Sequence, residues 1–140
     1  MSFLENMYKE VILDHYKRPR NRGALDPASV REEGLNPSCG DELELFLEID
    51  GGTVQNVSFV GEGCAISQAS ASMMTEAIKG KAVSEVLDLS SKFKAMIGGD
   101  TPDDALGDLK TLQGVAKLHA RVKCATLSWV TLEQALEGFS

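Results

Sequence analysis

The chain contains three cysteines, and their surroundings are those of reactive or metal-binding thiols. They lie in the segments Asn36-Pro-Ser-Cys39-Gly-Asp41, Gly61-Glu-Gly-Cys64 and Arg121-Val-Lys-Cys124. Glycine, proline or basic residues flank each one, so we expect the thiols to be reachable and readily ionised. With Asp41 two positions after Cys39, the chain offers three sulfurs and one carboxylate, the ligand number of a tetrahedral zinc ion.

The residues alone leave other interpretations open. Any single free cysteine also fits a small buried hydrophobic residue. The spacing of the three cysteines also differs from the paired Cys-x-x-Cys of zinc ribbons and fingers, so it does not by itself identify a zinc site. His119 could replace Asp41 as the fourth ligand, although Gly40 favours Asp41 because a tight loop would let Cys39 and Asp41 reach one ion.

The composition indicates one soluble domain, residues 1–140, with 43% apolar and 25% charged residues. The net charge of −7 argues against nucleic acid as a partner, because nucleic-acid binding depends on neutralising phosphates. No run approaches the ~20 apolar residues of a membrane span, and the N-terminus lacks the pattern of a signal peptide. We expect a cytoplasmic protein in which an odd number of cysteines indicates metal or sulfur chemistry rather than disulfides.

The elements that must position the cysteines can be predicted from periodicity. An amphipathic helix is expected over 3–17, followed by a loop over 20–38 with a short strand near 29–33. Alternating leucine and acidic residues predict a strand over 42–50, wet on its acidic face and covered by helices on the other. Asp50-Gly51-Gly52 predicts a hairpin turn to a second strand over 53–60. This hairpin would carry Cys39 and Cys64 to the same end of the sheet.

Helices are expected over 64–79, 83–97 and 122–137, with a shorter one around Leu106, Leu109 and Leu112. The last of these places Cys124 in its first turn, where the helix dipole favours a thiolate. His15, on the apolar stripe of the first helix, is expected to be partly buried and hydrogen-bonded rather than a metal ligand. Lys17, Arg18, Arg20 and Arg22 form a basic cluster, either a solvated surface or a docking site for an acidic partner.

Three stretches together resemble a known family. Asn-Pro-Ser-Cys-Gly-Asp, Gly-Glu-Gly-Cys-Ala-Ile-Ser-Gln-Ala-Ser and Ala-Arg-Val-Lys-Cys-Ala-Thr-Leu-Ser-Trp look like the cysteine motifs of the IscU/NifU N-terminal family of iron–sulfur assembly proteins, and more narrowly of its SufU branch. The similarity runs over nearly the whole chain. The resemblance implies an α+β fold, in which helices pack on one face of a small antiparallel sheet of about three strands.

The resemblance also implies a function and a site. Zn²⁺ would be bound by Cys39, Asp41, Cys64 and Cys124, and Cys39 would accept sulfur from a SufS-type, pyridoxal-phosphate-dependent cysteine desulfurase. The sulfur would then pass to downstream iron–sulfur assembly proteins, which makes the chain a sulfurtransferase-like relay. Arg121 would offset the negative charge of the ligands from outside the ligand set.

Two departures from the IscU branch favour sulfur relay over cluster assembly. Scaffold members carry a histidine immediately before the third cysteine, where this chain has Lys123, and they carry a Leu-Pro-Pro-Val-Lys segment that is missing here. The alternatives are a scaffold that assembles a [2Fe–2S] cluster, with iron or the cluster on the same four ligands, and a binding module with a purely structural zinc.

Overall fold

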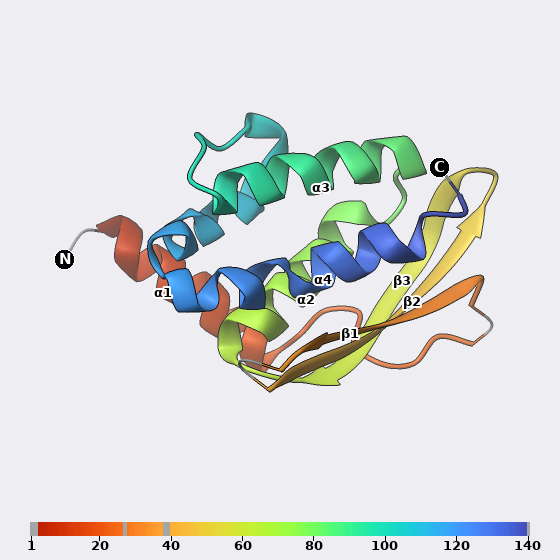
Figure 1. Cartoon of the computed structure of the whole chain (residues 1–140), viewed down its shortest axis with the longest axis horizontal. Coiled ribbons are helices and arrows are strands. Elements are labelled where there is room, and N and C mark those ends of the chain that lie inside the picture. Colours follow the sequence, from red (N-terminus) through yellow and green to blue (C-terminus); the bar gives the residue numbers. More distant parts are fainter. Residues whose placement is uncertain (1–2, 27, 38–39, 140) are drawn as a thin grey trace.

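A segment of alternating leucines and acidic residues, Asp41–Asp50, is the central strand of the sheet. The computed structural model describes residues 3–26, 28–37 and 40–139, with side chains from residue 10 onward (Figure 1). The described elements are, in order, α1 (Phe3–Lys17), β1 (Val30–Asn36), β2 (Asp41–Asp50), β3 (Thr53–Glu62), α2 (Ala65–Ile78), α3 (Val83–Ile97), the 3₁₀ segments η1 (Asp104–Lys117) and η2 (His119–Arg121), and α4 (Val122–Ala135).

The described strands pair antiparallel in the order β1-β2-β3. Gly51 and Gly52 both have positive φ angles, 61° and 76°, which a tight hairpin turn between β2 and β3 requires. The register sets Glu42 opposite Glu62, so the start of β2 and the end of β3 lie at the same edge of the sheet. This confirms that the hairpin brings the chain around Asp41 next to Cys64.

The helices pack on one face of the sheet, as expected for an α+β protein (Figure 1). Leu45, Leu47 and Phe59 point from the sheet into this layer and are fully buried. α2 is the central helix and contacts α1, α4 and β3. Its small side chains allow this close packing, and the hydroxyl of Ser70 donates a 2.6 Å hydrogen bond to the carbonyl of Ala125 in α4. The predicted fold class is therefore confirmed.

The predicted bounds of α1 and α3 agree with the structure, whereas two other expectations need correction. The first strand was expected near 29–33 but extends to Asn36. The outer face of the sheet is not uniformly wet, because Phe46 is only 2% exposed there and the guanidinium carbon of Arg31 lies 5.1 Å from its ring centroid. A cation over an aromatic face shields the ring from water.

The segment before α4 consists of the kinked 3₁₀ segment η1 and the short η2 rather than one short helix. Within η1, Gly107 adopts φ 55° and ψ −127°, which breaks the helical path. Leu106, Leu109 and Leu112 on either side are buried against the core as predicted. Among the described helices, none combines the length and apolar character needed to cross a membrane.

Candidate metal centre

Asp41 begins β2 and is the best-anchored of the candidate ligands. It is only 2% exposed. Its Oδ1 accepts a 2.9 Å hydrogen bond from the backbone N–H of Cys64, and its Oδ2 accepts a 3.3 Å bond from Nδ2 of Asn36. A carboxylate oxygen has two lone pairs, so each oxygen keeps one for a cation. These bonds fix the orientation of the carboxylate.

Cys64 caps the N-terminus of α2. Its φ and ψ angles of −71° and 166° are extended, and its Sγ accepts a 3.4 Å hydrogen bond from the backbone N–H of Ser67. This is the geometry of an ordinary N-cap, with sulfur in place of the usual oxygen. The partial positive charge of the helix terminus favours a negatively charged sulfur at this position.

Cys124 lies in the first turn of α4, as predicted, but it is not reachable from solvent. Its side chain is 0% exposed, whereas that of Cys64 is partly exposed. The expectation that each thiol is accessible is therefore wrong for Cys124, because α4 turns its first-turn sulfur inward. The amide Nδ2 of Asn36 lies 3.8 Å from this sulfur.

These three side chains converge on one point. A carboxylate oxygen of Asp41 and the sulfurs of Cys64 and Cys124 all lie within 4.8 Å of one another. Tetrahedral zinc with bonds of about 2.0 Å to oxygen and about 2.3 Å to sulfur sets these ligand atoms about 3.5–3.8 Å apart, so inward movements of less than about 1 Å per atom bring the three into coordination distance. Two thiolate sulfurs and one carboxylate are a suitable donor set for zinc. Cys39, the remaining predicted ligand, lies outside the described residues.

Glycine makes this convergence possible. A side chain at Gly63 would place its Cβ 2.5 Å from Oδ1 of Asp41. A side chain at Gly61 would collide with the carbonyl oxygen of Glu42 on the neighbouring strand. The end of β3 can therefore approach the start of β2 closely enough for Asp41 to reach Cys64 only because both positions lack a side chain.

The family comparison agrees with this arrangement. Residues 7–139 match the model of the NifU-like N terminal domain. The chain belongs to this family. The prediction made from the three cysteine motifs is therefore confirmed.

Relatives within the NifU-like N-terminal domain family carry two kinds of name. The zinc-dependent sulfurtransferase SufU of Bacillus subtilis is 50% identical over 97% of this chain and 95% of its own. The iron–sulfur cluster assembly scaffold protein IscU of Thermotoga maritima is 44% identical over 96% of this chain and 95% of its own. A solved structure of a SUF-system protein from Fervidobacterium islandicum superposes with a TM-score of 0.89 at 40% identity, covering 95% and 98% of the two chains.

Other predicted residues lie apart from this centre. His119 is exposed and is not part of the group of described side chains that could share an ion. Nδ1 of His15 lies 2.8 Å from Oγ of Ser72 in α2, so the prediction of a partly buried, hydrogen-bonded histidine is confirmed. Arg121 is exposed at the end of η2, three residues before Cys124.

Sequence reasoning missed one residue of the centre, Asn36. It ends β1, is 5% exposed and donates toward both Asp41 and Cys124. Its only signal was its place in the segment Asn-Pro-Ser-Cys-Gly-Asp, where an amide precedes the ligands. Asn36 is the register partner of Asp41 between β1 and β2, and this pairing directs its side-chain amide toward Asp41 and Cys124.

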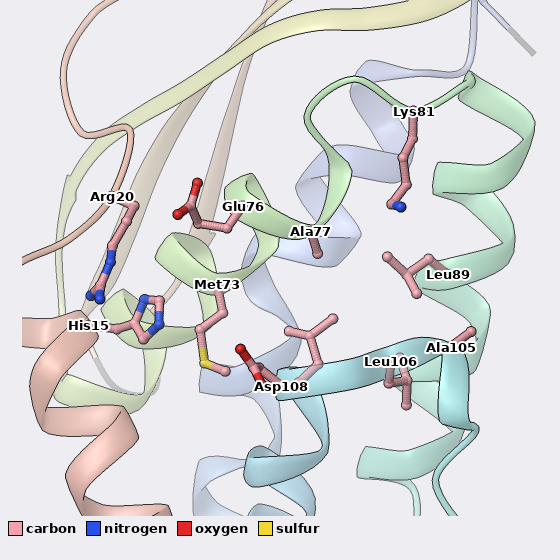
Figure 2. Close-up of a pocket in the computed structure, with 11 residues that line it drawn as sticks. His15, Arg20, Met73, Glu76, Ala77, Lys81, Leu89, Ala105, Leu106 and Asp108 are labelled. Carbon is pink, nitrogen blue, oxygen red and sulfur yellow. The ribbon is translucent and has the colours of Figure 1, made fainter.

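A cavity of about 400 Å³ lies between α1, α2, α3 and η1 (Figure 2). His15 borders it, and the charged side chains of Arg20, Glu76, Lys81 and Asp108 surround an apolar floor. Burial lowers the pKa of His15 below its usual value, and the positive charge of Arg20 adds to this effect. Asp41, Cys64 and Cys124 do not line this cavity, so it is separate from the candidate metal centre.

Proposed function

We propose that this chain is a sulfur acceptor in iron–sulfur cluster assembly, which takes persulfide sulfur from a cysteine desulfurase of the SufS type and passes it on. The observation that carries the proposal is the convergence of Asp41, Cys64 and Cys124 within 4.8 Å. The 50% identity with a zinc-dependent sulfurtransferase over nearly the whole of both chains supports it.

Zinc is the metal that this donor set fits. Cys39, Asp41, Cys64 and Cys124 would hold it, and the ion would keep the sulfurs deprotonated near neutral pH and protect them from oxidation. Asn36 would fix the orientations of Asp41 and Cys124 through its amide hydrogens. Arg121 and Lys123 would offset the negative charge of the ligand set.

Cys39 is the residue to which we assign sulfur acceptance. Cys124 is completely buried, and Cys64 is engaged as the N-cap of α2, so neither sulfur can meet a donor without disturbing a helix terminus. The Cys39 thiolate would attack the outer sulfur of the donor persulfide. One S–S bond then forms on Cys39, the S–S bond of the donor breaks, and the donor cysteine leaves as a thiolate that takes up a proton from solvent. The exchange needs no external oxidant or reductant.

A scaffold for a [2Fe–2S] cluster is the second candidate. The identity of 44% with an IscU scaffold favours it, and thiolates bind iron as well as zinc. Lys123, at the position where scaffold members of the IscU branch carry a histidine, supports relay instead. The colour of the purified protein separates the two functions: relay predicts a colourless protein with one zinc per chain, whereas a scaffold predicts a brown protein with charge-transfer bands.

The direct test is a desulfurase turnover assay with and without this protein, paired with metal analysis. Wild-type protein should accelerate turnover of a SufS-type desulfurase and carry a labelled persulfide sulfur. Cys39→Ala should abolish both. Full stimulation by Cys39→Ala would refute its assignment as acceptor, and no stimulation by zinc-loaded wild-type protein would refute sulfur relay altogether.

A further inference from the structure

α4 carries Cys124 in its first turn, so the placement of this helix decides where the buried sulfur lies. α4 packs against both α2 and β1. α2 carries Cys64 at its N-terminus, and β1 ends at Asn36, whose amide faces Asp41 and Cys124. Each of these two neighbours of α4 therefore contributes a part of the metal centre.

A hydrogen bond fixes α4 against α2 directly beside Cys124. The hydroxyl of Ser70 in α2 donates to the carbonyl of Ala125 in α4 at 2.6 Å. Both residues are 0% exposed, so the bond lies where water does not compete with it. Ala125 follows Cys124 in the chain, and Ser70 lies less than about two helical turns after Cys64. Because helices are rigid over this length, the bond sets the separation of the two backbones that carry these thiols.

The contact between α4 and β1 is equally close, and it depends on Gly34. A Cβ at this position would collide with Oγ1 of Thr131 in α4 and would lie 3.2 Å from Cδ1 of Leu127. Gly34 is buried and does not have a positive φ angle, so the lack of space rather than the backbone conformation requires glycine here. Asn36 lies two residues further along the same strand. The contact therefore also sets how closely this end of β1 approaches Cys124.

Metal coordination requires this precision more than packing does. Apolar contacts are non-directional, whereas a hydrogen bond has a preferred length and angle. Alanine at position 70 would fill nearly the same space, but it would let α4 slide along α2. The ligand atoms of Asp41, Cys64 and Cys124 lie within 4.8 Å of one another, and a zinc ion requires about 3.5–3.8 Å. A slide of about 1 Å would therefore remove Cys124 from the reach of an ion held by the other two.

We propose that Ser70 and Gly34 are positioning residues of the metal centre. They fix α4 against α2 and β1, so that the sulfur of Cys124 stays within reach of an ion bound by Cys64 and Asp41. The inference rests on the proposed function, because it requires that these side chains bind a metal ion. Neither positioning residue touches the ion or the transferred sulfur. Their effect is on the affinity for the ion, because a displaced ligand has to be brought back before it can coordinate.

Ser70→Ala tests the hydrogen bond, with Ser72→Ala as its counterpart in the same helix. Ser72 is also 0% exposed, but its hydroxyl lies 2.8 Å from both Nδ1 of His15 and the backbone N of Arg20, which are not part of α4. Both variants lose a buried hydrogen-bonded hydroxyl, so both should lower the melting temperature by about 2–6 °C.

Only Ser70→Ala should also weaken zinc binding. We expect a loss of about tenfold in affinity, the lower end of the range for groups that support a metal ligand, whereas Ser72→Ala should change the affinity by less than about twofold. Competition with a chromophoric chelator gives the affinities. In the Co²⁺-substituted proteins, the sulfur-to-metal charge-transfer bands should weaken for Ser70→Ala and stay unchanged for Ser72→Ala. A serine with only a structural role would lower the melting temperature without changing either metal measurement.

A compensating pair of substitutions tests the contact with β1 independently. Gly34→Ala should lower the zinc affinity about tenfold, because the new Cβ collides with Oγ1 of Thr131 and pushes β1 and α4 apart. Thr131→Ala alone should bind zinc as tightly as wild type. In Gly34→Ala/Thr131→Ala the colliding oxygen is gone, and the remaining contacts at 3.2 Å require shifts of only a few tenths of an ångström. The double variant should therefore recover to within about threefold of the wild-type affinity.

The outcomes separate this inference from the proposed function. If wild-type protein binds zinc and Ser70→Ala binds it equally tightly with an unaltered Co²⁺ spectrum, the role of Ser70 is wrong and the sulfur-acceptor function stands. Equal losses of affinity in Ser70→Ala and Ser72→Ala would overturn it too, since affinity would then follow stability alone. A double variant that binds zinc as weakly as Gly34→Ala would overturn the role of Gly34.

The proposed function can also fail by itself. If wild-type protein binds zinc but does not stimulate the desulfurase, sulfur acceptance is refuted, and the zinc affinities still decide the roles of Ser70 and Gly34. If wild-type protein does not bind zinc, both proposals fail.

Discussion

The amide of Asn36 is the group whose loss should most selectively weaken metal binding. One NH₂ group faces two candidate ligands, Oδ2 of Asp41 at 3.3 Å and Sγ of Cys124 at 3.8 Å, which lie 5 and 88 residues away along the chain. Asn36→Ala removes both contacts and leaves the ligands themselves intact. Its effect therefore measures how far the ligands are pre-positioned before the ion arrives.

The expected size follows from the contacts. A hydrogen bond to a charged group contributes about 1.5–3 kcal/mol, and the longer contact to sulfur adds less. This agrees with the 10–100-fold loss of affinity that is typical when a group supporting a metal ligand is removed, about 1.4–2.8 kcal/mol. Competition with a chromophoric chelator gives the zinc affinity directly. The absorption bands of the Co²⁺-substituted protein report whether the thiolates still bind the metal.

Asn56→Ala is the matched control. Asn56 also donates to a carboxylate, Oε1 of Glu48 at 2.6 Å, but it lies on the outer side of the hairpin away from the cysteines. The Asn56→Ala variant should leave the zinc affinity unchanged. An Asn36→Ala protein with wild-type zinc affinity and an unaltered Co²⁺ spectrum would refute the reasoning, even if its free energy of unfolding were lower.

Two further predictions concern other parts of the structure. Gly63→Ala forces a Cβ to within 2.5 Å of Asp41 Oδ1, so we expect a loss of about 1–3 kcal/mol in unfolding free energy together with reduced zinc content; wild-type values of both would contradict the close approach. His15 has a lowered pKa because it is partly buried and faces Arg20, so the unfolded chain binds its proton more readily than the folded one. Its contribution to stability is therefore complete above the ordinary value near 6.5 and is lost as pH falls through the lowered folded value. Denaturant titrations from pH 7.5 to 5 should show a smaller fall in stability for His15→Gln than for wild type, with His119→Gln as the control; equal falls in all three proteins would refute this.

Much of the fold could be predicted because hydrophobic periodicity decides it. The alternation in β2 and the paired glycines after Asp50 specify a hairpin, and the hairpin alone brings Cys64 beside Asp41. The helical bounds of α1 and α3 followed from apolar stripes bounded by Pro19 and by Gly98. Local sequence signals were sufficient to predict those helices and strands whose own apolar pattern determines which face packs against the core.

The remaining features depend on contacts between distant segments. Phe46 sits on the polar side of β2 and gave no sign of being buried, since its cover comes from Arg31 on another strand. The burial of Cys124 depends on the rotation of α4 against α2 and β1. Asn36 acquires its role from the register between β1 and β2, which a single sequence does not specify when the strand itself is short and charged.

The distribution of the candidate ligands over the elements bears on what the metal is for. Asp41 begins a strand, Cys64 caps one helix and Cys124 lies in the first turn of another, so an ion would join three element ends at one edge of the sheet. The core also contains large side chains that are not part of the candidate ligand group, among them Trp129, whose ring centroid is stacked 4.7 Å from that of Phe93. A domain with such a core does not need a metal in order to fold. This is why the proposed function assigns the ion a functional role rather than a structural one.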